Sequence, residues 1–301
     1  MKTKTSAIKN SKEDKVFYFI TYALVTLVFL SVLYPIVYVI SASFSSPTAV
    51  STGKVVLWPV DFSLEGYKAV FENQDVLIGY RNTIFYTVFG TFINVAVTLF
   101  AAYPLSRRDF VGRRYFLFFF TFTMLFNGGM IPTYMAMRDL HLLNTVWAVL
   151  LPGAIAVYNL MVARSFIESN IPRDLLEATQ VDGCSDFRYF WNFVLPLSKP
   201  VIAVITLFYA VTHWNAYFNA FLYLDDRNLF PLQLFLREIL INNKVDASTA
   251  MVDQAFLEAK QGLADLLKYA LIVVSTLPIM CLYPFVQKYF IKGVMIGSVK
   301  G

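Results

Sequence analysis

Six stretches of this 301-residue sequence contain no Asp, Glu, Lys or Arg and are long enough to cross a membrane. A helix needs roughly 20 apolar residues to span the hydrocarbon core of a bilayer. The stretches do not alternate apolar and polar residues with period two, so they predict helices rather than barrel strands. We therefore expect an all-α membrane protein with six transmembrane helices, at residues 16–40, 83–105, 115–137, 142–163, 200–224 and 269–287.

The composition agrees with a membrane protein. Charged residues make up 15% of the chain, against about 25% in soluble globular domains, and hydrophobic residues make up 57%. This balance argues against a soluble enzyme, a disordered protein and a nucleic-acid binder. The two cysteines, Cys184 and Cys281, are too few for a disulfide framework, and with two histidines they predict no metal cluster.

The distribution of basic residues predicts the orientation. We expect the first stretch to be retained as a helix, because its apolar run is too long for a secretory signal. With the N-terminus in the cytoplasm, the inside segments hold sixteen of the 25 basic residues and eight of the 20 acidic ones. This excess of positive charge inside predicts that both termini are cytoplasmic. We find no repeat and no soluble domain, so residues 1–301 are expected to form a single transmembrane domain.

Two segments are expected outside, at residues 43–82 and 225–268. Helix-like apolar spacing at 232–241 and 254–267 predicts short helices near the outer surface. A soluble partner could dock on them, or they could be packed surface loops without a partner.

The cytoplasmic loop at residues 164–199 has the clearest local pattern. Pro172 suits the first turn of a helix, Gly183 suits its end, and Ser185 can cap a second helix. The second helix has an apolar stripe that ends at Leu195-Pro196, made of Phe187, Phe190, Trp191 and Val194. This hairpin of two short helices either lies on the lipid surface or docks into a cytoplasmic partner.

Residues of this loop resemble a known motif. Glu177-Ala178-Thr179, Gly183 and Leu195-Pro196 look like the EAA loop of ABC-importer permeases, with Thr179 in place of an alanine. Further segments resemble the carbohydrate-uptake branch of that family and extend the likeness over nearly the whole chain: 102–107, 126–132, 213–217, 290–293 and 297–301. The resemblance implies the MetI-like permease fold with a cytoplasmic coupling helix.

The resemblance also implies partners and a location. Such permeases work in the bacterial cell membrane with a second, usually different permease subunit, two cytoplasmic ATPase subunits and an extracytoplasmic sugar-binding protein. This chain has no Gly-x-x-x-x-Gly-Lys-Ser/Thr loop. We therefore expect no enzymatic activity and no cofactor in this chain, with ATP bound by the partner subunits.

Coupling to the ATPases would fall on the loop. The resemblance implies that Glu177 pairs with a basic residue of the ATPase, that Gly183 permits the bend, and that Phe187 and Phe190 fill an apolar pocket. The basic tail that ends at Gly301 would reach between the ATPase subunits. The full set of expected coupling residues is Glu177, Ala178, Thr179, Gly183, Phe187, Phe190, Leu195 and Pro196.

A sugar path needs polar side chains that face the bundle interior and aromatic faces for pyranose rings. Thr212, Asn215 and Asn219 are spaced to share one face of the fifth span, and Trp214 and Tyr217 flank them. Asn94 and Asn159 suit hydrogen bonds between helices better. Two alternatives are a permease for a solute other than a sugar and a stand-alone secondary transporter. The latter favours intramembrane charges and internal repeats, which the spans lack.

Overall fold

The computed structural model describes residues 11–242 and 266–281, which contain helices and turns and no strand. Contacts divide the chain into two compact units. The first comprises Met1–Val70 with Asn243–Val273, and the second comprises Phe71–Asn242 with Val274–Gly301. Several predicted features lie outside the described residues: the N-terminal lysines up to Lys9, most of the helix at 254–267, the end of the sixth span after Cys281, and the tail.

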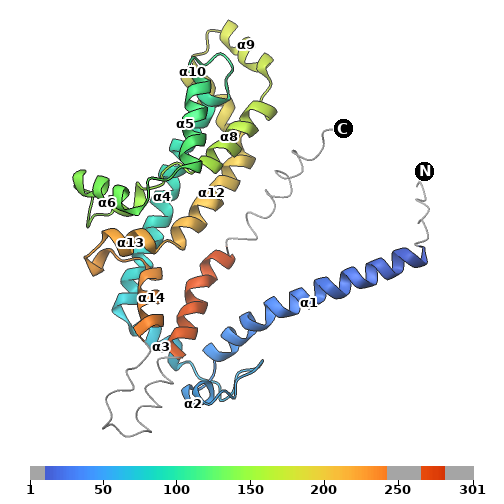
Figure 1. Ribbon diagram of the computed structural model, residues 1–301, viewed down its shortest axis with the longest axis vertical. Coiled ribbons are helices and arrows are strands. Elements are labelled where there is room, and N and C mark those ends of the chain that lie inside the picture. Colours follow the sequence, from blue (N-terminus) through green and yellow to red (C-terminus); the bar gives the residue numbers. More distant parts are fainter. Residues whose placement is uncertain (1–10, 243–265, 282–301) are drawn as a thin grey trace. The chain divides into compact units, whose positions relative to one another are not determined.

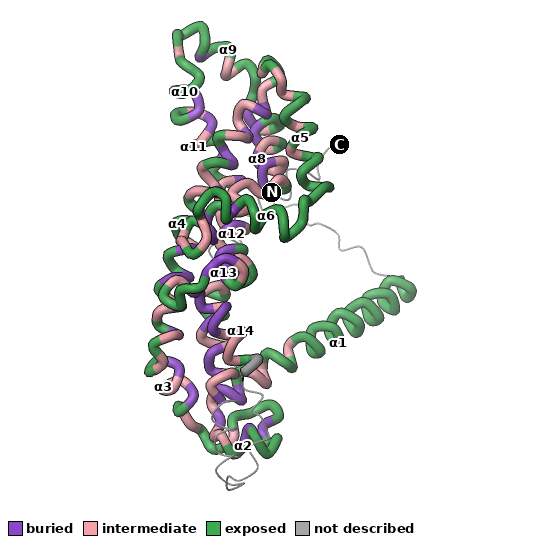
Figure 2. Tube along the Cα trace, turned by 60° about the vertical axis from the view of Figure 1, so that its left-hand side comes forward, coloured by how far each residue is buried: buried purple, intermediate pink, exposed green. Residues whose placement is uncertain are grey.

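The first unit begins with the long apolar helix α1 (Lys12–Ser43). Its start is fixed by a capping box, in which Ser11 and Asp14 each accept a hydrogen bond from the other's backbone N–H. Its most apolar window has a mean hydropathy of 2.5, and none of it is buried inside the chain. Figure 2 shows the helix exposed over nearly its whole length. The first predicted span is confirmed as one helix, and its surface is left for lipid or another subunit.

Two short helices follow, α2 (Pro47–Ser51) and α3 (Glu65–Glu72). The sequence analysis did not predict these two helices, and residues 74–82 belong to the next long helix rather than to a loop. Of the two short helices that it did predict, the one at 232–241 is confirmed by α14 (Leu232–Asn242). A small core holds the unit together, made of Ala42, Ala49, Val50, Val55 and Leu266.

The second unit is built around α4 (Gln74–Ser106). Figure 1 shows α8 (Val157–Asn170), α12 (Lys199–Trp214) and α14 (Leu232–Asn242) beside it. Each of these helices packs on α4, so α4 is the common support of the unit. Like α1, it is long and apolar enough to span a membrane alone, and within the described residues these two helices meet that condition.

The contact between α4 and α12 is close and partly polar. A Cβ atom on Gly90 would lie 2.5 Å from the ring of His213, so only glycine permits this approach. The Asn94 Nδ2 atom lies 3.1 Å from His213 Nε2, and one turn further Thr98 Oγ1 lies 2.7 Å from Tyr209 Oη. Buried hydrogen bonds of this kind hold helices together in a bilayer, which confirms the role expected of Asn94.

Three of the predicted spans are not single helices, which corrects the prediction. Residues 115–137 divide into α5 (Arg113–Leu125) and α6 (Met130–Asp139), with a bend of 117°. Residues 142–163 contain the short α7 (Trp147–Leu150) and only the start of α8. Residues 200–224 divide into α12 and α13 (Phe218–Tyr223).

Local backbone chemistry explains the breaks. Gly129 and Gly153 have positive φ angles of 89° and 75°, which other residues avoid. Asn215 caps α12 by donating its side-chain amide to the Val211 carbonyl at 2.9 Å. Two pairs of helices are joined by a sharp bend: α5 with α6, and the segment Asp186–Leu197 with α12. If each pair is one span, the described residues contain up to four spans, and a shorter apolar helix follows at Leu266–Cys281. The total of six spans stays a prediction.

Replacing Gly90 with alanine tests the close approach of α4 and α12. We expect Gly90→Ala to destabilise the protein by about 1–3 kcal/mol, because the methyl group forces the buried His213 ring to move. Thermal unfolding of the detergent-purified protein measures the effect. Gly128→Ala is the matched control, since its new methyl group would meet nothing closer than 3.9 Å. Equal melting temperatures for the two variants would contradict the packing.

Candidate functional site

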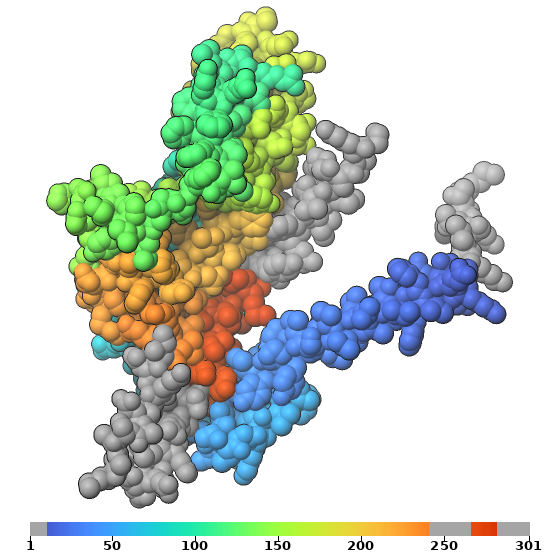
Figure 3. Space-filling view, viewed as in Figure 1, coloured from blue at the N-terminus to red at the C-terminus, as the bar shows by residue number. Residues whose placement is uncertain are grey.

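The loop between α8 and α12 lies at one end of the second unit (Figure 1), and its yellow-green atoms form the tip of that end in the space-filling view (Figure 3). It begins with α9 (Arg173–Val181), whose N-cap is Pro172. Gly183 follows with a φ of 72°, and the N–H of Cys184 donates to the Thr179 carbonyl at 2.9 Å. The predicted helix and its stop at Gly183 are confirmed.

The second helix of the loop is less regular than predicted. Ser185 caps α10 (Asp186–Tyr189) through its hydroxyl, as expected. A π-helical turn, η1 (Phe190–Val194), and α11 (Leu195–Leu197) continue it to an 80° bend into α12. A π-turn widens the helix and rotates the side chains that follow. The chain therefore enters α12 without the regular helix that the spacing predicted.

The predicted apolar stripe has two different environments. Phe187 and Trp191 are 67% and 50% exposed, whereas Phe190 is only 4% exposed. The Phe190 ring stacks on Phe100 of α4 at 5.2 Å between ring centroids. The expectation that Phe190 enters a partner's pocket is wrong, because this chain's own core already surrounds the ring. Phe187 is free to make such a contact.

The other motif residues also differ in exposure. Glu177, Ala178 and Pro196 are exposed, and Leu195 is half-buried. Thr179 is buried, and its hydroxyl donates to the Leu176 carbonyl at 2.8 Å, which explains how a polar residue fits in place of alanine. The loop thus presents a carboxylate and an exposed ring on a surface of its own.

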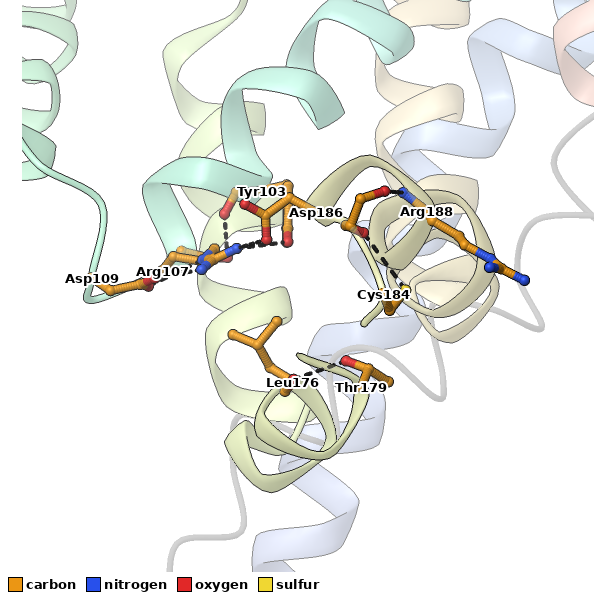
Figure 4. A network of polar contacts seen from close by, with 10 residues as sticks. Tyr103, Arg107, Asp109, Leu176, Thr179, Cys184, Asp186 and Arg188 are labelled. Atoms are coloured by element: carbon orange, nitrogen blue, oxygen red, sulfur yellow. Dashed lines mark hydrogen bonds and ion pairs between the residues drawn. The ribbon is translucent and has the colours of Figure 1, made fainter. Parts of the chain in front are cut away.

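Arg107 at the end of α4 ties this loop to the unit (Figure 4). Its guanidinium forms ion pairs with Asp109 and with Asp186, the first residue of α10, and donates to Tyr103 Oη at 3.2 Å. The Arg107 side chain is only 14% exposed. The hydrogen bond from Arg107 lowers the pKa of Asp109 below its usual value. From the sequence, Arg107 was predicted to be a basic residue of the inner face and lay in the segment 102–107 that resembles the family, but its partner Asp186 was not predicted.

A second cluster of polar side chains lies at the same end of α4. The Leu105 carbonyl, which has no partner inside the helix, accepts from Arg113 Nε at 3.0 Å and from Arg164 Nε at 3.1 Å. Both guanidinium groups also contact Glu168, at 2.9 and 2.5 Å. Cations are favourable at the negative end of a helix. This cluster joins α4, α5 and α8 beside the loop.

The expected path residues do not share one face. Because α12 ends at Trp214 and α13 begins at Phe218, Asn219 is not on the same helix as Thr212, and that prediction is wrong. The Thr212 hydroxyl donates to the Phe208 carbonyl at 2.8 Å, within its own helix. Trp214 is buried and donates Nε1 to the Ser275 carbonyl at 2.9 Å.

Three of the expected path residues surround the break between α12 and α13. Asn215 and Tyr217 are exposed and Asn219 is half-buried. Their role in contacting a solute stays a prediction.

Comparison with known proteins gives one consistent result. Residues 76–296 match the family described as "binding-protein-dependent transport system inner membrane component". The chain is 40% identical to the polygalacturonan/rhamnogalacturonan transport system permease protein YtcP of Bacillus subtilis, over 96% of this chain and 100% of the relative. It is 43% identical to the protein LplC of the same organism, over 89% of each chain.

A solved structure is also similar. A chain of a bacterial ABC transporter involved in the import of the acidic polysaccharide alginate superposes with a TM-score of 0.85. The two sequences are 37% identical, and the match covers 94% of this chain and all of the other.

Removing the Arg107 side chain tests whether it holds the loop in place. We expect Arg107→Ala to raise the rate of tryptic cleavage after Arg173 and Arg188 by roughly fivefold. That factor corresponds to the loss of about 1 kcal/mol from a solvent-accessible ion-pair network. Limited proteolysis of the purified protein measures it. The neighbouring Arg108 is exposed, so Arg108→Ala is the control. Equal cleavage rates in Arg107→Ala and Arg108→Ala would mean that Arg107 does not restrain the loop.

Proposed function

Because this chain belongs to the family of binding-protein-dependent transport system inner membrane components, we propose that it is the permease subunit of an ATP-driven oligosaccharide importer. The family is a membrane transport family and not a catalytic one. The names of several relatives refer to polysaccharide or oligosaccharide cargo, which supports a carbohydrate as the solute.

The partners follow from the same proposal. The subunit pairs with a second permease, receives its solute from an extracytoplasmic binding protein, and is driven by two cytoplasmic ATP-binding subunits. The sequence has no Gly-x-x-x-x-Gly-Lys-Ser/Thr loop, which supports the proposal that separate subunits hydrolyse ATP. The positive-inside rule supports cytoplasmic termini and a cytoplasmic loop at 164–199.

One observation supports the loop as the coupling element. Its outer surface carries the exposed residues Glu177 and Phe187, while its inner surface is buried against α4 and bonded to Arg107. The loop also continues into α12 with a bend but no linker. A push on the exposed residues when the ATPases close would therefore move α4 and α12 together. This movement would switch access of the solute path from outside to inside.

Copurification tests the docking. We expect the native chain, extracted in detergent from its own membrane, to bring down an ATPase and a second permease. Glu177→Ala and Phe187→Ala should lose the ATPase and keep the permease, because only the loop surface changes. Asp174→Ala is the control, since Asp174 is an exposed carboxylate on the same helix, α9.

Two outcomes would contradict the proposal. Retention of the ATPase by both loop variants would remove the loop from the interface. Solute transport by the chain alone in liposomes without ATP would indicate a secondary transporter instead.

A further inference from the structure

Arg237 of α14 lies against two aromatic rings of α13 and its flank. Its guanidinium carbon lies 4.3 Å from the centre of the Phe221 ring and 5.9 Å from that of the Tyr217 ring. Tyr217 and Phe221 are 41% and 51% exposed. The planar guanidinium stacks readily on such faces and keeps its N–H groups at the edge free to donate.

The charge of Arg237 is not neutralised by a carboxylate within the described part of the chain. The neighbouring Arg227 provides the contrast. Its guanidinium pairs with Asp75 at 2.8 Å and with Glu238 at 3.2 Å. Glu238, the residue next to Arg237, thus forms its ion pair with Arg227.

Arg237 is not one of the buried residues with which α14 packs in the core. Leu232, Leu234 and Phe235 of the same helix are buried in the second unit. Arg237 instead contacts the exposed rings next to the break between α12 and α13. In the proposed orientation this surface is at the outer side of the membrane, where solute arrives. An uncompensated guanidinium next to lipid is unfavourable, so this surface faces water or an anionic group.

The side chains here match the chemistry of an acidic sugar. A guanidinium binds a carboxylate with two parallel hydrogen bonds, and an exposed aromatic face suits the apolar face of a pyranose ring. Tyr217 provides such a face beside the cation. A ring stacked there would bring a carboxylate within reach of Arg237. The phosphate of a lipid headgroup is also an anion that a guanidinium can bind. Unlike an acidic sugar, however, it has no ring that would stack on an aromatic side chain.

We propose that Arg237, with Tyr217, is an anion-recognising part of the solute path and that the cargo is an oligosaccharide of uronic acids. This inference rests on the proposed function. Beyond that function, the inference states that the substrate is negatively charged and that Arg237 selects for this charge.

Uptake by the complete importer tests the proposal. The importer, with both permeases, the ATPases and the binding protein, is reconstituted in liposomes, with each probe at a concentration that saturates the binding protein. The probes are tetragalacturonate and its methyl ester, which has the same backbone without the charges. Maltotetraose is a neutral third probe. The variants are Arg237→Gln and Arg237→Lys, with Arg138→Gln as control because it removes an exposed arginine that pairs with its neighbour Asp139.

We expect Arg237→Gln to slow ATP-dependent uptake of tetragalacturonate about tenfold, as for the loss of one charged hydrogen-bonded pair. Uptake of the methyl ester should stay within about twofold of native. Arg237→Lys keeps the charge without the bidentate geometry and should be intermediate. Arg138→Gln should behave as native with both probes.

Several results would overturn the inference. Equal slowing of both probes by Arg237→Gln would indicate a structural stacking role, and no slowing would remove Arg237 from the path. A defect that follows the content of anionic lipid in the liposomes, rather than the charge of the probe, would indicate a lipid contact. A native importer that carries maltotetraose but not tetragalacturonate would contradict the inference alone. Failure to carry any of the three probes with ATP would contradict the proposed function itself.

Discussion

The contact of α12 with α4 at Gly90 is the constraint on which the second unit depends. With glycine at this position, the His213 ring reaches the backbone of α4 and bonds to Asn94. One turn further along, Tyr209 is within hydrogen-bond distance of Thr98 and also accepts from the N–H of Ala156, before α8 begins. In a bilayer the hydrophobic effect does not favour one apolar helix surface over another, so close packing and buried hydrogen bonds decide the association. These contacts join α4, α8 and α12.

At the Ser106 end of α4, further contacts join these helices to the loop. Arg107 bonds to Asp186, Phe190 is buried beside Phe100, and the Leu105 carbonyl holds two arginines from other helices. Phe190 and Leu105 are buried, whereas the Asp186 side chain is 65% exposed and is next to Phe187 in the sequence. The loop therefore has one side that packs on α4 and another side with exposed residues, as the proposed coupling to an ATPase requires.

Much of this arrangement could be predicted from the sequence, because hydropathy and local caps are properties of short segments. The helices α1 and α4, the Gly183 stop and the Ser185 cap were predicted correctly. Hydropathy does not report backbone geometry, so the breaks near Gly129, Gly153 and Asn215 were missed. Helical spacing placed Phe187 and Phe190 on one stripe, but a π-turn and packing on α4 separate them. The ion pair of Arg107 with Asp186 joins residues distant in sequence, which one sequence cannot pair.

We expect the loop and α4 to move together when ATP binds. Spin labels at Arg188→Cys on the loop and Val97→Cys on the exposed side of α4 measure it by pulsed electron paramagnetic resonance. Cys184 and Cys281 are replaced with serine, and the complete importer is compared with and without ATP under non-hydrolysing conditions. The account predicts the same distance distribution within the chain in both states. A distribution that shifts with nucleotide would show that the loop moves independently of α4 and would contradict the account.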